Sequence, residues 1–339
     1  MRKEFEVGPI RPPSEAESLL LRITRNCPWN KCKFCALYKN HQFSTRSIEE
    51  IKEDIDTAAS YGYGWESCFL QDANTMVLTF DKLREILTYL REKLPNIKRV
   101  TSYGRVDSLA KFSVEQFTAL KEAGLDRIHS GYESGSDKVL KLINKGYTKA
   151  QEIEAGQKVK ASGIELSVYF MPGVGGKELS MENAVETADV VSQANPDFVR
   201  IRTFVAHQGT EIQKDIDNGV ISDCSDIEKV LELKEMIANI KNADGRLISD
   251  HIINLFEDVN GNLSTDKEKM LSVFDAFFSL DRQQQKRYQL ARRMGMVRSL
   301  EHMELLGAVQ LNKIDSYLEQ LDSEEKLEAY LLRLLRHYI

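Results

Sequence analysis

The stretch NCPWNKCKFC, residues 26–35, contains three of the five cysteines in a chain of 339 residues. Cys27, Cys32 and Cys35 lie close together, and the two remaining cysteines are isolated. Five thiols cannot all pair in disulfides. In a reducing compartment, a tight group of cysteines is typical of metal binding or catalysis. This stretch therefore predicts a metal-binding or catalytic site.

Short apolar segments with β-rich composition recur along the first two-thirds of the chain, and amphipathic segments with helical spacing separate them. The pairs Ser47 with Glu50 and Ser113 with Gln116 predict two helix starts. A repeat of roughly 30–45 residues matches a strand with its crossover helix. The pattern predicts a parallel sheet, either open and doubly wound or curled into part of a (β/α) barrel. The apolar segments lie at 18–24, 66–71, 98–103, 126–132, 164–171 and 197–204. The cysteine stretch follows the first segment, at the strand end where such folds carry chemistry.

The alternation ends near residue 205, and the sequence from about 226 onward predicts mostly helices. Thr265 with Glu268 predicts one of the helix starts. No low-complexity linker separates this helical part from the preceding strands, so we expect the two to pack directly. We place a barrel domain at 1–250 and a helical subdomain at 251–339.

Composition and charge argue against several classes of partner. Hydrophobic residues make up 42% of the chain, enough for a core, and the net charge is −6. This balance gives no basic surface for polymeric nucleic acid or a membrane. No apolar run approaches the roughly 20 residues of a membrane span. The N-terminus MRKEFEVGPIRPPSEAE also lacks the apolar core of a signal peptide. We expect a cytoplasmic protein with no membrane or nucleic-acid partner.

Three kinds of site would use a group of cysteines like this one. A structural zinc site needs a fourth ligand, and the nearest histidine is His41, with no second CxxC in the chain. A dithiol redox site would use Cys32 and Cys35 and leave Cys27 without a role. A 4Fe–4S cluster usually takes four thiolates, and three would leave one iron open to bind another molecule.

The cysteine triplet, with Phe34 directly before its last member, resembles the radical S-adenosylmethionine (SAM) superfamily. The spacing here is CxxxxCxxC, one residue longer than the common CxxxCxxC. The resemblance implies a partial (β/α)6 TIM-like barrel with a C-terminal helical subdomain. It also implies a 4Fe–4S cluster on Cys27, Cys32 and Cys35, with SAM on the open iron and Phe34 beside the cofactor. The reduced cluster would cleave SAM to a 5′-deoxyadenosyl radical that abstracts hydrogen from a substrate. A flavodoxin or ferredoxin would supply the electron.

Further matches to the superfamily extend over roughly residues 18–260 and imply residues that bind SAM. The segment QDAN at 71–74 occupies the place of a family motif that meets the methionine amino group. This implies that Asp72 and Asn74 bind the ammonium, which needs carboxylate or carbonyl oxygens. The alternative is a polar turn that caps the following helix.

The segment GYESGSDKVLKLINKGYT resembles the coproporphyrinogen oxidase and methylthiotransferase branches of the superfamily. There the resemblance places Glu133 at the amino acid end or the ribose of SAM, with Ser134 close by. It places Lys160 on the methionine carboxylate, although a solvent-exposed lysine is an equal alternative. It places Met171 in the segment VYFMPGVGG, whose backbone would read adenine.

Residues at other strand ends are candidates for binding the substrate. Arg105 and Arg202 lie at or near strand ends, and His207 follows the second of them. A guanidinium can hold a phosphate or carboxylate through two parallel hydrogen bonds. Each arginine alone could equally form a surface ion pair.

The whole-chain pattern narrows the class further. Only 26 residues precede Cys27, and no second cysteine cluster follows it, so we expect neither a cobalamin domain nor an auxiliary cluster. The length, the segment GPIRPPSEAESLLLRITRNCPWNKCKFC and the helical last third are similar to the queuine lyases. That likeness implies a lyase in queuine salvage that releases queuine from queuosine or its 5′-phosphate. The alternatives are a single-cluster oxidoreductase or lyase for another small molecule, and a non-catalytic iron–sulfur sensor.

Overall fold

The structure, a computed structural model, describes residues 11–338 and divides them into two compact units. The units interleave along the chain, whereas the sequence predicts a single division after residue 250. Within the second unit, Leu335 from the last helix shares a buried apolar cluster with Val205 and Ile253. The first unit comprises the described residues up to Tyr132, Lys145–Val168 and Ala194–Asp197; the second comprises Glu133–Asn144, Tyr169–Gln193 and the described residues from Phe198 onward.

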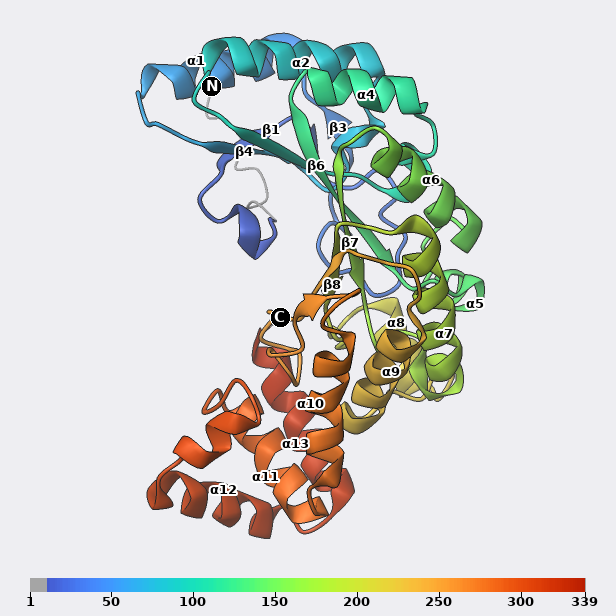
Figure 1. Ribbon diagram of the computed structural model, residues 1–339, viewed down its shortest axis with the longest axis vertical. Coiled ribbons are helices and arrows are strands. Elements are labelled where there is room, and N and C mark those ends of the chain that lie inside the picture. The colour runs from blue at the N-terminus through green and yellow to red at the C-terminus, as the bar shows by residue number, and fades with distance from the viewer. Residues whose placement is uncertain (1–10, 339) are drawn as a thin grey trace. The chain divides into compact units, whose positions relative to one another are not determined.

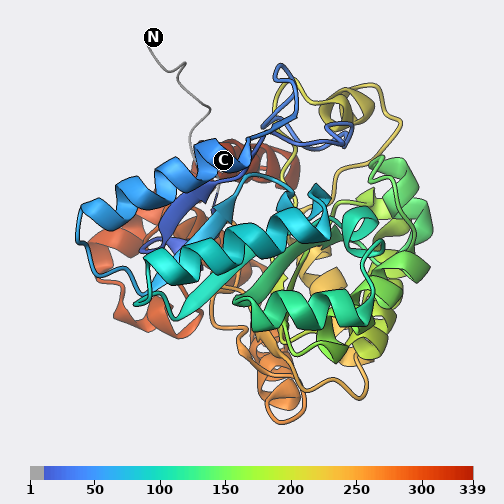
Figure 2. The same cartoon turned by 90° about the horizontal axis from the view of Figure 1, so that it is seen from above.

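The first unit is a layer of parallel strands with helices α1, α2 and α4 on one face (Figure 1). Figure 2 shows the same three helices side by side over the strands. The strands are β1 (Leu19–Arg22), β4 (Ser67–Gln71), β5 (Arg99–Tyr103), β6 (Leu125–Glu133) and most of β7 (Glu165–Phe170), with the short pair β2 (Thr24–Arg25) and β3 (Ser44–Thr45). The helices are α1 (Ile48–Ser60), α2 (Phe80–Lys93), α3 (Val106–Leu109), α4 (Val114–Glu122) and α6 (Lys149–Ala161), with the 3-10 turns η1 (Pro13–Glu15) and η2 (Thr75–Val77).

Local chemistry explains where these helices begin. Ser47 and Glu50 form a reciprocal capping box at α1, and Ser113 and Gln116 form another at α4, as the sequence predicts. Each helix then turns an apolar stripe toward the strands, as Ile51 and its neighbours do in α1. Burying one such side chain contributes roughly 1.5–3 kcal/mol.

The second unit contains the remaining strands and most of the C-terminal helices. Within it, β8 pairs in parallel with β9, and β10 pairs antiparallel with β9. Its strands are β8 (Phe198–Ile201), β9 (Arg246–Ile248) and β10 (Gly261–Asn262). Its helices are α5 (Asp137–Leu142), α7 (Gly176–Ala194), α8 (Glu211–Asp217), α9 (Asp226–Asn239), α10 (Lys267–Ser279), α11 (Arg282–Arg293), α12 (Ala308–Gln320) and α13 (Glu324–Leu335), with the turns η3 (Glu301–Leu305) and η4 (Arg336–Tyr338).

A buried ion pair ties two helices of the second unit together. Arg293 of α11 donates two hydrogen bonds to the carboxylate of Asp226 in α9, at 2.9 and 2.8 Å, and a third to the carbonyl of Ile253. Burial alone would raise the pKa of Asp226, but the Arg293 guanidinium outweighs it and lowers that pKa. The predicted start of α10 at Thr265 is wrong, because Asp266 precedes the first helical residue and makes no side-chain cap.

The described strands follow the order β1-β4-β5-β6-β7-β8-β9-β10 in one mostly parallel sheet. Six of them match the six predicted apolar segments, and β9 and β10 are short additions. The α/β class and the partial TIM-like barrel type are confirmed. Within residues 11–338, no helix has both the length and the apolar character to cross a bilayer. Residues 1–10 of the stretch used to argue against a signal peptide lie outside the described residues.

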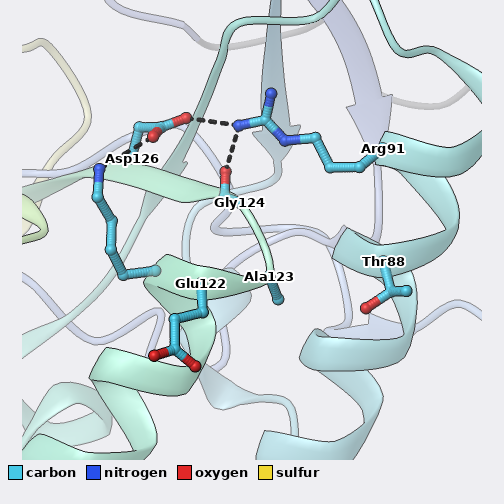
Figure 3. A pocket seen from close by; sticks show the side chains of 7 residues that line it. Thr88, Arg91, Glu122, Ala123, Gly124 and Asp126 are labelled. Atoms are coloured by element: carbon cyan, nitrogen blue, oxygen red, sulfur yellow. Dashed lines mark hydrogen bonds and ion pairs between the residues drawn. The ribbon is translucent and has the colours of Figure 1, made fainter.

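A surface depression of about 410 Å³ lies at the amino ends of β5 and β6 (Figure 3). Arg91 donates 2.8 Å hydrogen bonds to the carbonyl of Gly124 and to Asp126, and Lys121 approaches the same carboxylate at 3.0 Å. A Cβ at Gly124 would lie 2.3 Å from the Nε atom of Arg91, and the φ of 112° at this residue lies in the region that favours glycine. Side chains at this end of a barrel support stability more than chemistry.

Candidate cofactor site

The cysteine loop follows β1 and β2 at the carboxyl end of the strands, as the sequence predicts. All three cysteines are free thiols: Cys32 is buried, and Cys27 and Cys35 are half-buried. The backbone N–H of Cys35 donates to the carbonyl of Cys32 at 3.4 Å, which forms a tight turn around Phe34. The loop therefore presents three unpaired sulfurs within one short segment.

Asp72 holds both ends of this loop. Its carboxylate accepts from the backbone N–H of Asn26 at 3.1 Å, just before Cys27, and from the Tyr38 hydroxyl at 2.7 Å, just after Cys35. Arg22 lies 3.7 Å away, and only 1% of Asp72 is exposed. Burial and the Asp72 carboxylate raise the pKa of Tyr38, so its hydroxyl stays a donor. These contacts fix the loop, and the SAM ammonium contact expected of Asp72 stays a prediction.

Asn74 is fully buried and also has partners within the first unit. Its Oδ1 atom accepts from the backbone N–H of Arg105 at 3.0 Å, and its Nδ2 atom donates to the Ser108 hydroxyl at 2.8 Å. These bonds fix the segment that follows β5. The SAM contact expected of Asn74 stays a prediction.

Arg105, expected to bind the substrate, points to the cysteine loop. Its Nη1 atom lies 4.0 Å from the sulfur of Cys32, and only 8% of the residue is exposed. The other guanidinium nitrogens donate to Asp107 and to the carbonyl of Lys145. These contacts engage three of its five N–H donors, and the expectation that Arg105 holds a substrate phosphate stays a prediction.

The thiols of the loop fit an iron–sulfur cluster. Burial raises the pKa of Cys35 and the sulfurs of Cys32 and Cys27 raise it further, whereas a backbone hydrogen bond and the charge of Lys145 lower it. Thus the sulfurs of Cys32 and Cys27 both lie within electrostatic range of Cys35. Among residues 11–338, no three His, Cys, Asp or Glu side chains converge to hold one metal ion. A cube does not need such convergence, because each thiolate binds a different iron.

Lys160 lies elsewhere in the first unit. It is near the end of α6, where its ammonium pairs with Asp197 at 2.5 Å, and Asp197 also accepts from the backbone N–H of Leu166 near the start of β7. These contacts place Lys160 at the amino edge of the strands, because a helix runs back from the carboxyl edge before the next strand begins. The ion pair matches the alternative of a structural lysine, and the expected contact with the SAM carboxylate stays a prediction.

Glu133 and Met171 meet within the second unit. Glu133 ends β6, and its carbonyl accepts from the backbone N–H of Met171, the first residue after β7, at 2.9 Å. Glu133 has a φ of 69°, in the left-handed region that residues other than glycine seldom adopt. Such backbone strain is concentrated at functional sites. The geometry keeps Glu133 and Met171 as candidates for SAM binding.

Glu232 of α9 is a buried acceptor that the sequence analysis missed. It accepts from the backbone N–H of Gly173 at 3.0 Å, the Ser180 hydroxyl at 2.5 Å and the Asn183 amide at 2.7 Å. The Oδ1 atom of Asn183 also accepts a hydrogen bond from the hydroxyl of Ser134, a buried residue in the loop after β6. Burial raises the pKa of Glu232 to about 7, although its three donors act in the opposite direction. Glu232 therefore links the loops that carry Glu133 and Met171.

Arg202 and His207 lie after β8 in the second unit. Arg202 is exposed, and within residues 11–338 its guanidinium makes no hydrogen bond or ion pair. Burial and the Arg202 charge lower the pKa of His207 and lower that of His251 to about 4. One charged guanidinium therefore lies near two neutral imidazoles, a set of donors suited to an anion.

The two isolated cysteines, Cys68 and Cys224, are both buried and lie outside the cysteine loop. Cys68 is fully buried in β4, where burial raises the pKa of its thiol. Burial also raises the pKa of Cys224 to about 12. Thiols in such surroundings behave as small apolar side chains.

Residues 21–189 match the model of the Radical SAM superfamily. A tRNA-2-methylthio-N(6)-dimethylallyladenosine synthase of Petrotoga mobilis is 25% identical over 218 residues, which cover 60% of this chain and 49% of that protein. A biotin synthase of Gloeothece citriformis is 25% identical over 190 residues, 53% of this chain and 50% of that protein. The chain thus spans about half the length of these relatives. The crystal structure of the cobalamin-dependent radical SAM enzyme OxsB gives a TM-score of 0.50 at 17% identity, over 94% of this chain and 58% of that one, a likeness of fold.

This chain carries a radical SAM superfamily domain, and the cofactors of that domain are a 4Fe–4S cluster and S-adenosylmethionine. The family resemblance drawn from the cysteine triplet is confirmed at this level. The CxxxxCxxC spacing as the cluster motif, the individual SAM ligands and the queuine lyase subtype stay predictions.

Proposed function

We propose that this chain is a radical SAM lyase that acts on queuosine or its 5′-phosphate and releases queuine. The observation that carries the proposal is the loop of three free cysteines at the carboxyl end of parallel strands within a radical SAM domain. When bound and reduced, the cluster would supply one electron that splits SAM into methionine and a 5′-deoxyadenosyl radical. That radical would take a hydrogen atom from the ribose and become 5′-deoxyadenosine. The base would then leave with the bonding electron pair and take up a proton, and the flavodoxin or ferredoxin donor would supply one electron and the solvent a proton to the sugar radical.

The chain's own residues would bind and orient the cofactors. Cys27, Cys32 and Cys35 would each bind one iron, and Phe34 would pack beside SAM. Glu133 would accept hydrogen bonds from the methionine ammonium, because an ionised carboxylate is a strong acceptor for that group. Met171 would place the backbone of its loop against the adenine. The electron would come from a flavodoxin or ferredoxin, and the proposed compartment is the cytoplasm, where thiols are kept reduced.

We expect the Glu133→Gln variant to bind SAM more weakly. A charge-assisted hydrogen bond contributes roughly 1.5–3 kcal/mol, so the dissociation constant should rise by about one to two powers of ten. Calorimetric titration of the cluster-loaded protein with SAM measures this dissociation constant. Glu211→Gln, an exposed change of the same kind on α8, is the matched control. Equal affinity in both variants would move the ammonium contact to another residue.

A nucleotide substrate has two kinds of support. The exposed Arg202, with His207 and His251 nearby, offers donors for a 5′-phosphate in the second unit. The Petrotoga mobilis relative is named for a modified tRNA adenosine, whereas biotin synthase is named for a small molecule. The name of the Petrotoga mobilis relative refers to tRNA, and this does not match the expectation that the chain has no polymeric nucleic-acid partner. The substrate test therefore compares a free nucleotide with tRNA.

The test is anaerobic incubation of the cluster-loaded protein with SAM, a strong reductant and either queuosine 5′-phosphate or queuosine-containing tRNA, followed by mass spectrometry. We expect queuine only from the free nucleotide. We also expect the Arg202→Gln variant to raise the KM for the 5′-phosphate but not for queuosine. Formation of 5′-deoxyadenosine without queuine would contradict the substrate and leave the radical chemistry intact. Queuine released from tRNA alone would contradict the small-molecule part of the proposal.

A further inference from the structure

Arg105 places a fixed positive charge beside one cysteine of the loop. Its Nε atom donates to Asp107 at 3.0 Å, and its Nη2 atom donates to the carbonyl of Lys145 at 2.8 Å. The remaining nitrogen, Nη1, lies 4.0 Å from the sulfur of Cys32, which is itself buried. Each nitrogen of the guanidinium therefore has its own partner, and one of these partners is a cluster ligand.

Two aromatic rings fix the plane of this guanidinium. The ring centres of Trp29 and Tyr147 lie 5.4 and 5.5 Å from its central carbon. A cation over a ring face is attracted to it. Trp29 packs so closely on Gly146 that a Cβ there would lie 2.4 Å from the indole, and Gly146 has a φ of 87°. The segment around Lys145 thus closes over the loop and holds Arg105 against Cys32.

We propose that Arg105 is a positioning residue of the cluster, which hydrogen-bonds the thiolate of Cys32 and makes reduction of the cluster easier. The inference rests on the proposed cluster site. Reduction adds one electron from an external donor and moves no proton, because the guanidinium keeps its charge. A nearby positive charge in a poorly hydrated place stabilises the more negative state. Hydrogen bonds to the sulfurs and solvent exposure are known determinants of such potentials.

Lys145 provides a second positive charge near the loop. It is buried, and its ammonium lies 5.4 Å from the ring centre of Phe34 and 5.8 Å from that of Tyr147. This charge remains in an Arg105 variant. A change in potential between the wild type and Arg105→Gln therefore measures the contribution of Arg105.

The experiment is a reductive titration of the reconstituted protein without SAM, followed by electron paramagnetic resonance. We expect Arg105→Gln to lower the equilibrium constant for one-electron reduction at least tenfold, a shift of about 59 mV to lower potential. Arg105→Lys keeps the charge but cannot serve three partners at once, so its shift should be smaller. Arg91→Gln is the matched control, because Arg91 also bonds backbone carbonyls and a carboxylate, at the amino edge of the same unit. That variant should lose thermal stability and keep the wild-type potential.

A second readout covers a variant that holds too little cluster for titration. Iron release to a chelator should be faster in both Arg105 variants than in Arg91→Gln, because only the former loosen Cys32. Wild-type potential together with wild-type iron release in Arg105→Gln and Arg105→Lys would overturn the inference. Those results would leave the proposed function standing as long as the wild type holds a cluster. A wild type that holds none would contradict the proposed site itself.

Discussion

Replacing Cys27, Cys32 and Cys35 together by alanine is expected to abolish cluster binding. The three thiolates are the protein ligands of the proposed cube, and its remaining iron is open. Iron should fall from roughly four atoms per chain to near zero after anaerobic reconstitution. The measurement is iron and sulfide quantitation, with the visible absorption of the cluster as a second readout.

The matched control is the pair of changes Cys68→Ala and Cys224→Ala. Both cysteines are buried apolar residues, so these variants should lose some stability through small cavities and still bind a full complement of iron. A triple variant that retains its iron would show that the cluster, if present, has other ligands. The same conclusion would follow if the two control changes removed it.

Replacing Asp72 by alanine is expected to loosen the cysteine loop without removing a ligand. The change leaves two donors without their acceptor, the half-buried Asn26 N–H and the buried Tyr38 hydroxyl. Each lost partner costs about 1–3 kcal/mol. We expect less iron after reconstitution, faster iron loss to a chelator and a lower melting temperature.

Two further variants separate an effect on the cysteine loop from an effect on overall stability. Tyr38→Phe removes one of the two donors, so its effect on iron retention should be smaller than that of Asp72→Ala. Asp81→Asn changes a highly exposed carboxylate on α2 and should leave iron retention unchanged. If Asp72→Ala retained iron as firmly as Asp81→Asn, the carboxylate would not be fixing the loop.

The fold was predictable from sequence because its signals are local. Alternating apolar segments predicted the six long strands, and the capping boxes at Ser47 and Ser113 predicted two helix starts. At α10 the capping residue is shifted by one position, from Thr265 to Asp266, and such shifts are typical of boundary predictions. The two compact units were not predictable, because their limits depend on contacts between segments far apart in the chain.

The cysteine triplet was predictable as a site because its ligands are neighbours in sequence. The roles of Asp72 and Arg105 were not, because their partners lie 34 to 73 residues away, at Tyr38, Lys145 and Cys32. Side chains at strand ends look alike in sequence whether they bind a ligand or one another. Only the structure separates the buried Arg105, which has a partner at each guanidinium nitrogen, from the exposed Arg202.

One weak feature of the sequence indicated that Glu232 is a buried acceptor. It lies on the buried side of α9 among apolar residues such as Leu233 and Met236. A carboxylate on an apolar stripe needs partners, because burial of an unpaired charge is costly. Its partners, Gly173, Ser180 and Asn183, come from two other segments and could not be read from the helix alone.

Formation of 5′-deoxyadenosine is the most direct test of radical SAM chemistry in this chain. The cluster-loaded wild type is incubated anaerobically with SAM and a strong reductant, and the nucleoside is quantified by mass spectrometry. We predict that 5′-deoxyadenosine accumulates with the wild type and stays at background with the Cys27, Cys32 and Cys35 triple alanine variant. A wild type that holds its cluster and binds SAM, yet forms no more 5′-deoxyadenosine than that variant, would contradict the account and favour a non-catalytic iron–sulfur protein.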